Sequence, residues 1–263
     1  MAWWVGQTNI LICFLAAFFV GQVLIHSAGA LLHETAHRLI FHDSRRKLLF
    51  DLGLEAMLGS FGKQLTYQHD HVRGHHPHLG DYELDYEHED LCHLSSRQWI
   101  KAERPAVGRI LVALTLLIHL LPFGFLLGDA VMPALYRRLA GRPIKDVSRP
   151  LASAKIDLGY RLLFIGVTLM VNVFLLWAFG FLGWLYHNWS ISLFLGKCGV
   201  TNLGQSLSEH PGDEAGIPTY SDYRFANWLL FNTGYHNEHH TFPNVPLACL
   251  IFCTRRNERL LHV

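Results

Sequence analysis

Histidine is the residue that this sequence uses most unusually, with 18 histidines in 263 residues. Three clusters hold histidines at helical spacing, where positions three or four residues apart project from one face. Each cluster can direct two or three imidazoles at one point, and neutral imidazole is the commonest side-chain ligand for metals. These clusters are His33–His37, His71–His76 and His236–His240.

A fourth contribution comes from His210, which directly follows Ser208 and Glu209. Together these histidines exceed what one four- to six-coordinate ion can bind, but they suit two ions. Imidazole binds Fe, Zn, Cu and Ni alike, so the ligand type leaves the metal open. His69 and His78 flank the second cluster and remain alternative ligands there. The nine candidate ligands are His33, His37, His71, His75, His76, His210, His236, His239 and His240.

Carboxylates accompany the histidines along the chain. A metal-bound histidine usually donates its second ring N–H to a carboxylate or a carbonyl oxygen. Three glutamates are direct neighbours of a candidate ligand, and two aspartates follow the second cluster. We predict these five as the acidic residues of the catalytic site: Glu34, Glu209, Glu238, Asp81 and Asp85.

The elements that must position these side chains are apolar. The chain is 51% hydrophobic and 16% charged, whereas soluble domains carry about 25% charged residues. No Asp, Glu, Lys or Arg occurs from Met1 to Leu32, a stretch long enough to cross a hydrocarbon core of about 30 Å. Because it lacks a basic start, it predicts a transmembrane helix over about 9–30 and not a cleaved signal peptide.

A second charge-free run covers residues 162–196. As one helix it would be about 50 Å long at 1.5 Å per residue, which is too long for a single crossing. We therefore expect two spans, over about 161–181 and 186–207, with a turn that begins near Gly180. Trp184, Tyr186 and Trp189 lie near this turn, as is typical of a membrane interface.

Two further apolar segments predict helices that lie in the plane of the membrane. The segment 48–61 contains acidic residues. The segment 108–135 is interrupted by Pro122 and is flanked by arginines on both sides, which favours both ends in one compartment.

Basic residues indicate the orientation of the chain. Arg38, Arg45, Arg46 and Lys47 follow the first span, and none precedes it. The positive-inside rule then places the histidine clusters in the cytoplasm. The sequence therefore predicts an all-α, multi-pass membrane protein of one domain (1–263), with a cytosolic helical cap that carries the clusters. Its membrane would be the endoplasmic reticulum in a eukaryote or the inner membrane in a bacterium.

Charge and cysteine content exclude other classes of protein. The 22 basic residues against 21 acidic residues leave no surplus to attract nucleic acid. The five cysteines are scattered and have no CxxC spacing, so neither a disulfide framework nor a thiolate zinc site is indicated.

At the histidine clusters the sequence resembles the membrane fatty acid desaturase superfamily, and most closely the sphingolipid Δ4-desaturases. The segment Phe231–Pro246 is similar to that family's third histidine box, FNVGYHNEHHxFPxIP, and Ser208–His210 resembles its AEH element. One departure is the second box, which reads HxxxHH here and HxxHH in the family. The HxxxHH spacing also occurs in alkane hydroxylases.

The resemblance implies a non-haem di-iron centre bound by the nine histidines. It also implies O2 as co-substrate, an acyl or sphingoid chain as substrate, and a separate electron donor of the cytochrome b5 or ferredoxin type. An alkyl C–H bond has no acidic proton, so a redox metal must do this chemistry. The prediction is a lipid desaturase. A hydroxylase on the same scaffold is the first alternative, and a non-enzymatic metal-binding membrane protein is the second.

Overall fold

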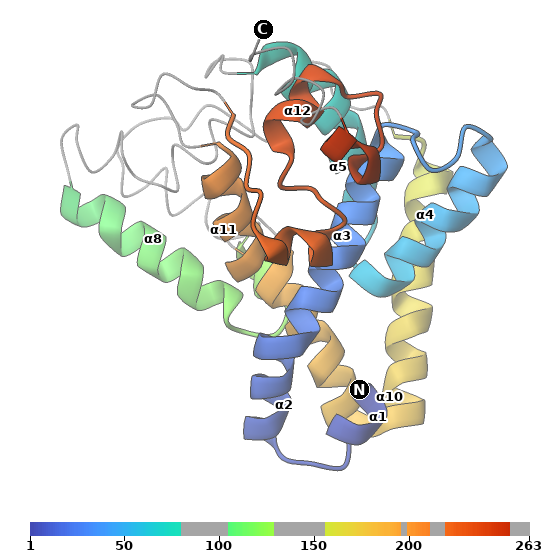
Figure 1. Cartoon of the computed structure of the whole chain (residues 1–263). Helices are drawn as coiled ribbons and strands as arrows, with labels where there is room; N and C mark the ends of the chain where they lie inside the picture. Colours follow the sequence, from blue (N-terminus) through green and yellow to red (C-terminus); the bar gives the residue numbers. More distant parts are fainter. Residues whose placement is uncertain (80–104, 129–155, 196–198, 211–218, 253–263) are drawn as a thin grey trace, which may run out of the picture.

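The computed structural model describes residues 1–79, 105–128, 156–195, 199–210 and 219–252. Throughout these residues the chain forms helices and loops without a β-strand, which confirms the all-α prediction for this part of the chain. In Figure 1, α2 (Ile10–Ala16) lies at the lower end of the molecule, α3 (Gln22–Ala36) and α10 (Leu158–Phe194) extend upward from there, and α5 (Lys63–Asp70) and α12 (His236–Thr241) lie at its upper end. The N-terminus lies at the lower end, where α1 (Ala2–Val5) packs against α10.

The first apolar stretch is a continuous helical run of 27 residues, Ile10–Ala36. It consists of α2 (Ile10–Ala16), a π-helical turn η1 (Ala17–Gly21) and α3 (Gln22–Ala36). Asn9 begins it, because its side-chain oxygen accepts the amide hydrogens of the first helical turn. The run is long and apolar enough to cross a membrane. It continues beyond the predicted end at residue 30, and this extension carries the first histidine cluster.

The second apolar stretch, α10 (Leu158–Phe194), folds back on itself at Gly180, where φ is 69° and ψ is −175°. The indole N–H of Trp184 and the amide of Asn188 both donate to Asn172 Oδ1, at 2.8 and 2.9 Å. In a straight helix Asn172 and Asn188 would stand about 24 Å apart. Non-glycine residues rarely adopt the backbone conformation of Gly180. The predicted turn is therefore confirmed, and its two arms lie antiparallel.

The helix of the predicted third span does not continue unbroken to residue 207. Leu195 leaves the helical conformation with ψ of 148°. A separate helix, α11 (Val200–Glu209), then begins after Gly199, which is also extended, with ψ of 132°. Residues 200–209 therefore form a second, shorter helix that lies beside α3.

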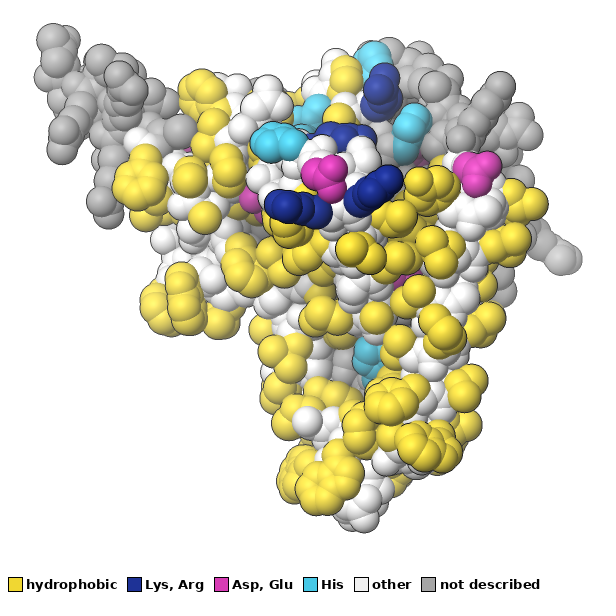
Figure 2. All heavy atoms as spheres, turned by 90° about the vertical axis from the view of Figure 1, so that its right-hand side faces the viewer, with side chains coloured by type: hydrophobic (Ala, Val, Ile, Leu, Met, Phe, Trp, Pro, Cys, Tyr) yellow, Lys and Arg dark blue, Asp and Glu magenta, His cyan; other side chains and the backbone are white. Residues whose placement is uncertain are grey.

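Large apolar side chains cover the outside of these helices. Trp177 is 82% exposed and Phe19 is 68% exposed. Figure 2 shows hydrophobic side chains over most of the lower part of this face, whereas Lys, Arg, Asp, Glu and most of the visible His gather near its upper end. Exposed apolar surface on this scale marks a contact with a membrane or a partner.

The two predicted in-plane segments are helical, with different bounds. Helix α4 (Ser44–Leu58) begins before residue 48 and ends at Gly59, which takes the left-handed conformation typical of a helix C-terminus. Helix α8 (Pro105–His119) ends before Pro122, because proline disfavours helical geometry in the residue before it. Residues 124–128 are helical again, and 129–135 lie outside the described residues.

A buried carboxylate fixes the helix that leads to the second histidine cluster. Glu55 on α4 is completely buried and accepts hydrogen bonds from the Ser60 hydroxyl at 2.6 Å and the Gly62 amide at 3.1 Å. It also accepts from Gln64 on α5 (Lys63–Asp70) and from Thr168 on α10. These bonds join α4, α5 and α10, so α5 begins at a fixed place.

Candidate metal centre

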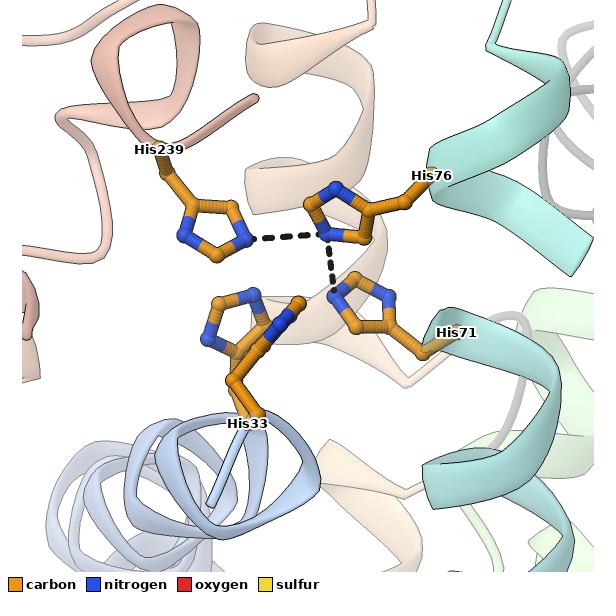
Figure 3. Close-up of side chains that lie close together, drawn as sticks. His33, His71, His76 and His239 are labelled. Atoms are coloured by element: carbon orange, nitrogen blue, oxygen red, sulfur yellow. Dashed lines mark hydrogen bonds between the residues drawn. The ribbon is translucent and has the colours of Figure 1, made fainter. Parts of the chain in front are cut away.

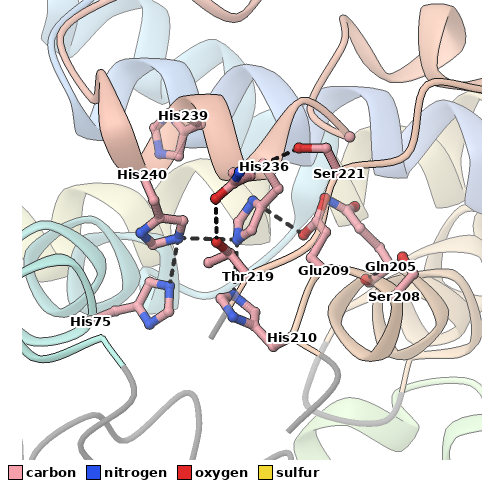
Figure 4. Close-up of polar contacts among 12 residues, drawn as sticks. His75, Gln205, Ser208, Glu209, His210, Thr219, Ser221, His236, His239 and His240 are labelled. Carbon is pink, nitrogen blue, oxygen red and sulfur yellow. Dashed lines mark hydrogen bonds and ion pairs between the residues drawn. The ribbon is translucent and has the colours of Figure 1, made fainter. Parts of the chain in front are cut away.

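The nine predicted histidines meet in two groups at the upper end of the molecule. Within each group the ligand nitrogens lie within 4.8 Å of one another. Figure 3 shows the rings of four members of the first group directed at a common centre, and Figure 4 shows the second group. The first group is His33, His37, His71, His76 and His239, and the second is His75, His210, His236 and His240.

Four separate parts of the chain supply these rings. The end of α3 supplies the first cluster. The second lies on a π-helical turn, η2 (His71–His75), and the short 3-10 helix η3 (His76–His78) that follows it. The third lies on α12 (His236–Thr241), and His210 directly follows α11.

The second and third clusters are each divided between the two groups. On α12 the first and last histidines, His236 and His240, belong to the second group, whereas His239 belongs to the first. On η2 and η3 the first and last, His71 and His76, belong to the first group, and His75 belongs to the second. Both helical segments therefore bridge the two groups in the same pattern.

The π-helical winding explains how HxxxHH produces this pattern. At about 100° per residue, an α-helix would place His71 and His76 about 140° apart around its axis. The wider π turn spans five residues, and it brings the Nε2 atoms of these two rings to 3.2 Å. The HxxxHH cluster is one residue longer than an HxxHH cluster, and the π turn accommodates this additional residue.

The separations between ring nitrogens fit shared metal ions. In the second group Nε2 of His236 lies 2.9 Å from that of His210 and 3.1 Å from that of His240. In the first group Nε2 of His239 lies 3.0 Å from that of His76. Two imidazole nitrogens that each bind one ion at about 2.1 Å stand about 3.0 Å apart at a right angle and about 3.4 Å apart at the tetrahedral angle. The rings therefore present their nitrogens at the spacing that coordination requires.

The protonation of the rings also suits metal binding. Burial, and then repulsion from neighbouring imidazoles, lowers the pKa of His71, His236, His239 and His240 well below that of an ordinary histidine. Rings with such pKa values are neutral at pH 7 and keep a lone pair for a metal. The donor set is therefore neutral nitrogen, which suits iron among other transition metals.

The predicted carboxylates occupy different positions. Oε2 of Glu209 lies 3.5 Å from Nδ1 of His236, so this carboxylate stands beside a candidate ligand as predicted. Glu34 accepts a hydrogen bond from the amide of Leu247 at 3.3 Å. Asp81 and Asp85 lie outside the described residues.

Glu238 holds the loop before α12. It accepts hydrogen bonds from the Ser221 hydroxyl at 2.6 Å and the Tyr223 hydroxyl at 2.7 Å. Burial and this carboxylate raise the pKa of Tyr223 to about 12, so the phenol keeps its proton and remains a donor. Neither hydroxyl was among the predicted site residues.

The alternative ligands of the second cluster lie outside both groups. His69 pairs through Nδ1 with Asp70 Oδ1 at 2.9 Å, and His78 belongs to neither group. Sequence reasoning also missed His26 and Gln205, which are in contact with each other. The available signal was that His26 is a titratable residue inside an apolar, membrane-length helix, where such residues are rare and usually functional.

Comparison with known proteins agrees with this arrangement. The family model described as fatty acid desaturase matches residues 8–261, which is nearly the whole chain. The chain belongs to the fatty acid desaturase family. The resemblance first drawn from the histidine clusters is therefore confirmed.

Several relatives of this desaturase-family chain carry the name sphingolipid delta(4)-desaturase DES1. The protein from Drosophila melanogaster is 28% identical over 236 residues, covering 88% of this chain and 62% of the relative. The mouse protein is 38% identical over 80 residues, or 30% of this chain and 24% of the relative. The human protein is 54% identical over 43 residues, covering 16% and 13%. The chain thus matches about three fifths of the length of the Drosophila relative. No solved structure matches this chain.

Proposed function

We propose that the chain is an O2-dependent lipid desaturase in which the two histidine groups hold two iron ions. The observation that carries the proposal is the convergence of nine buried or half-buried imidazoles in two groups, with ring nitrogens about 3 Å apart. When bound, the two irons would supply the redox chemistry that breaks an unactivated C–H bond. The protein's own residues bind and orient these ions and keep the ligand rings neutral.

The overall reaction balances as an oxidation of the lipid. One –CH2–CH2– unit, O2, two electrons and two protons give one –CH=CH– unit and two waters. In this proposal the electrons come from a separate donor of the cytochrome b5 or ferredoxin type.

We further propose a long acyl or sphingoid chain as the substrate. The names of the relatives support a sphingolipid, and the exposed apolar helices support delivery from a bilayer. In this proposal the chain crosses the membrane several times as one domain. Its histidines face the cytoplasm, in the endoplasmic reticulum of a eukaryote or the inner membrane of a bacterium.

Hydroxylation on the same scaffold is the competing reaction. The HxxxHH spacing was the reason to consider it, but the π turn gives His71, His75 and His76 the same division between groups that α12 gives its HxxHH sequence. The spacing therefore does not favour hydroxylation over desaturation.

Mass spectrometry of total lipids tests the proposal, using cells that express the wild-type chain or its His239→Ala variant together with an electron donor. Desaturation predicts lipids lighter by two hydrogens in the wild type only. A gain of one oxygen would select the hydroxylase. An unchanged lipid profile, with exchangeable zinc in purified protein, would replace the enzyme with a metal-binding membrane protein.

A further inference from the structure

A line of polar side chains leads from the first membrane-length helix to the second histidine group. It begins at His26 on α3, which is 5% exposed and lies against the ring of Phe194 with 4.8 Å between centroids. The Nε2 atom of His26 contacts Oε1 of Gln205 on α11. An amide oxygen carries no hydrogen, so His26 must donate this hydrogen bond.

The line continues along α11. The side-chain amide of Gln205 donates to Oε1 of Glu209 at 2.7 Å. The other oxygen of that carboxylate, Oε2, lies 3.5 Å from Nδ1 of His236. Figure 4 shows Gln205 and Glu209 on one side of the His236 ring, with His210 and His240 near it.

The donors along this line have a consistent direction. Nε2 of His236 faces the nitrogens of His210 and His240, so Nδ1 is the nitrogen that can donate to Glu209. A histidine that donates through one nitrogen to a carboxylate has its other nitrogen fixed as the metal ligand, in both tautomer and ring orientation.

We propose that His26 and Gln205 are positioning residues of the metal centre. They hold the Glu209 carboxylate in one orientation, and Glu209 in turn orients His236 in the second group. The inference rests on the proposed function, because it requires metal ions at the two groups. In the first group, by contrast, Nδ1 of His239 is buried without a hydrogen-bond partner among the described residues.

This difference between the groups separates positioning from general stability. A buried hydrogen bond that merely joins α3 to α11 would affect both groups alike when it is lost. Loss of a contact in the line that ends on His236 should weaken metal binding in the second group alone. The first group therefore serves as an internal control within the same molecule.

The experiment measures iron release from the full-length chain in detergent after loading with Fe²⁺. Wild-type protein, His26→Phe and Gln205→Leu are mixed with an iron chelator, and release is followed as the coloured complex forms. We expect two ions per chain in each protein. In both variants one of the two ions should leave faster than in the wild type, by no more than the about 10–100-fold expected for losing the direct partner of a metal ligand, while the other ion keeps its wild-type rate.

Two further variants sharpen the result. Gln22→Leu removes another buried amide from α3, one turn before His26. The side-chain amide of Gln22 donates a hydrogen bond to the backbone oxygen of Phe18, so the iron release rates of this variant should match the wild type. His26→Gln restores an N–H donor at residue 26 and should slow release back toward the wild-type rate.

The outcomes separate this inference from the function on which it rests. Two bound ions with wild-type release in His26→Phe and Gln205→Leu would overturn the positioning role alone. Faster release of both ions to the same extent would also overturn it, because the effect would then be global. A wild-type chain that binds no iron would overturn the proposed function, and the positioning role with it.

Discussion

Deletion of Gly74 tests whether the π turn accommodates the additional residue of the second histidine cluster, because it removes one residue from within this proposed metal site. The cluster would then hold its histidines at positions i, i+3 and i+4, the spacing found on α12. In an α-helix positions i and i+4 lie about 40° apart around the axis, whereas i and i+5 lie about 140° apart. The deletion should therefore change the π turn into an α turn and keep His71 and His76 in one group.

The matched control is deletion of Asn237 from α12, which is already α-helical. That deletion would leave histidines at i, i+2 and i+3, and it would turn the middle ring about 160° away from the first. Iron per purified chain, measured by elemental analysis, should stay at two after deletion of Gly74. The iron content should fall after deletion of Asn237. Activity should fall by more than about 100-fold, which is the upper end of the range for losing a hydrogen-bond partner of a metal ligand.

The refuting result is equally specific. If deletion of Gly74 removes iron as completely as deletion of Asn237, the π turn does not take up the additional residue, and the register of the cluster depends on all six of its positions. Thermal unfolding of both variants, measured in the same detergent, separates a local loss of ligands from a failure to fold.

Three other predictions concern single side chains. Glu209→Gln should lower iron retention and product formation about 10–100-fold, measured by chelator competition and lipid analysis; a wild-type rate would show that this carboxylate does not act on His236. Gly180→Ala should destabilise the protein by about 1–3 kcal/mol because of the backbone conformation, since the added Cβ would meet no atom within 4 Å. Gly166→Ala has equally open space but lies inside a helix, so it should stabilise the protein by about 0.5–1 kcal/mol. Glu55→Gln should cost about 2 kcal/mol of stability, because four donors share two carboxyl oxygens and the amide offers only one; an unchanged midpoint of thermal unfolding would contradict this.

The identity of the candidate ligands could be predicted because it depends on residue type and local spacing. The turn at Gly180 could also be predicted, since a charge-free run longer than a membrane is thick must bend or end. Hydropathy did not locate the ends of these helices, however. The third span was predicted to continue to residue 207, but the backbone leaves the helix at Leu195, and the first helix continues through polar residues to Ala36.

The division of the rings into two groups depends on contacts between distant parts of the chain. His76 and His239 meet although 163 positions separate them, and His26 and Gln205 are 179 positions apart. No local pattern encodes such pairs. The π winding of the second cluster was missed for a related reason, because helical periodicity assumes α geometry at every turn.

The order in which the ligands are synthesised has a consequence for how the centre is assembled. The first group contains His33, close to the start of the chain, and His239, which emerges from the ribosome about 200 residues later. At about 5–20 residues per second, the early histidines wait about 10–40 s for their last partner. During that time the apolar helices are already made, but neither group is complete. A metal ion can therefore meet a complete group only after the third cluster has been made, and a chain that stops before the third cluster assembles neither group.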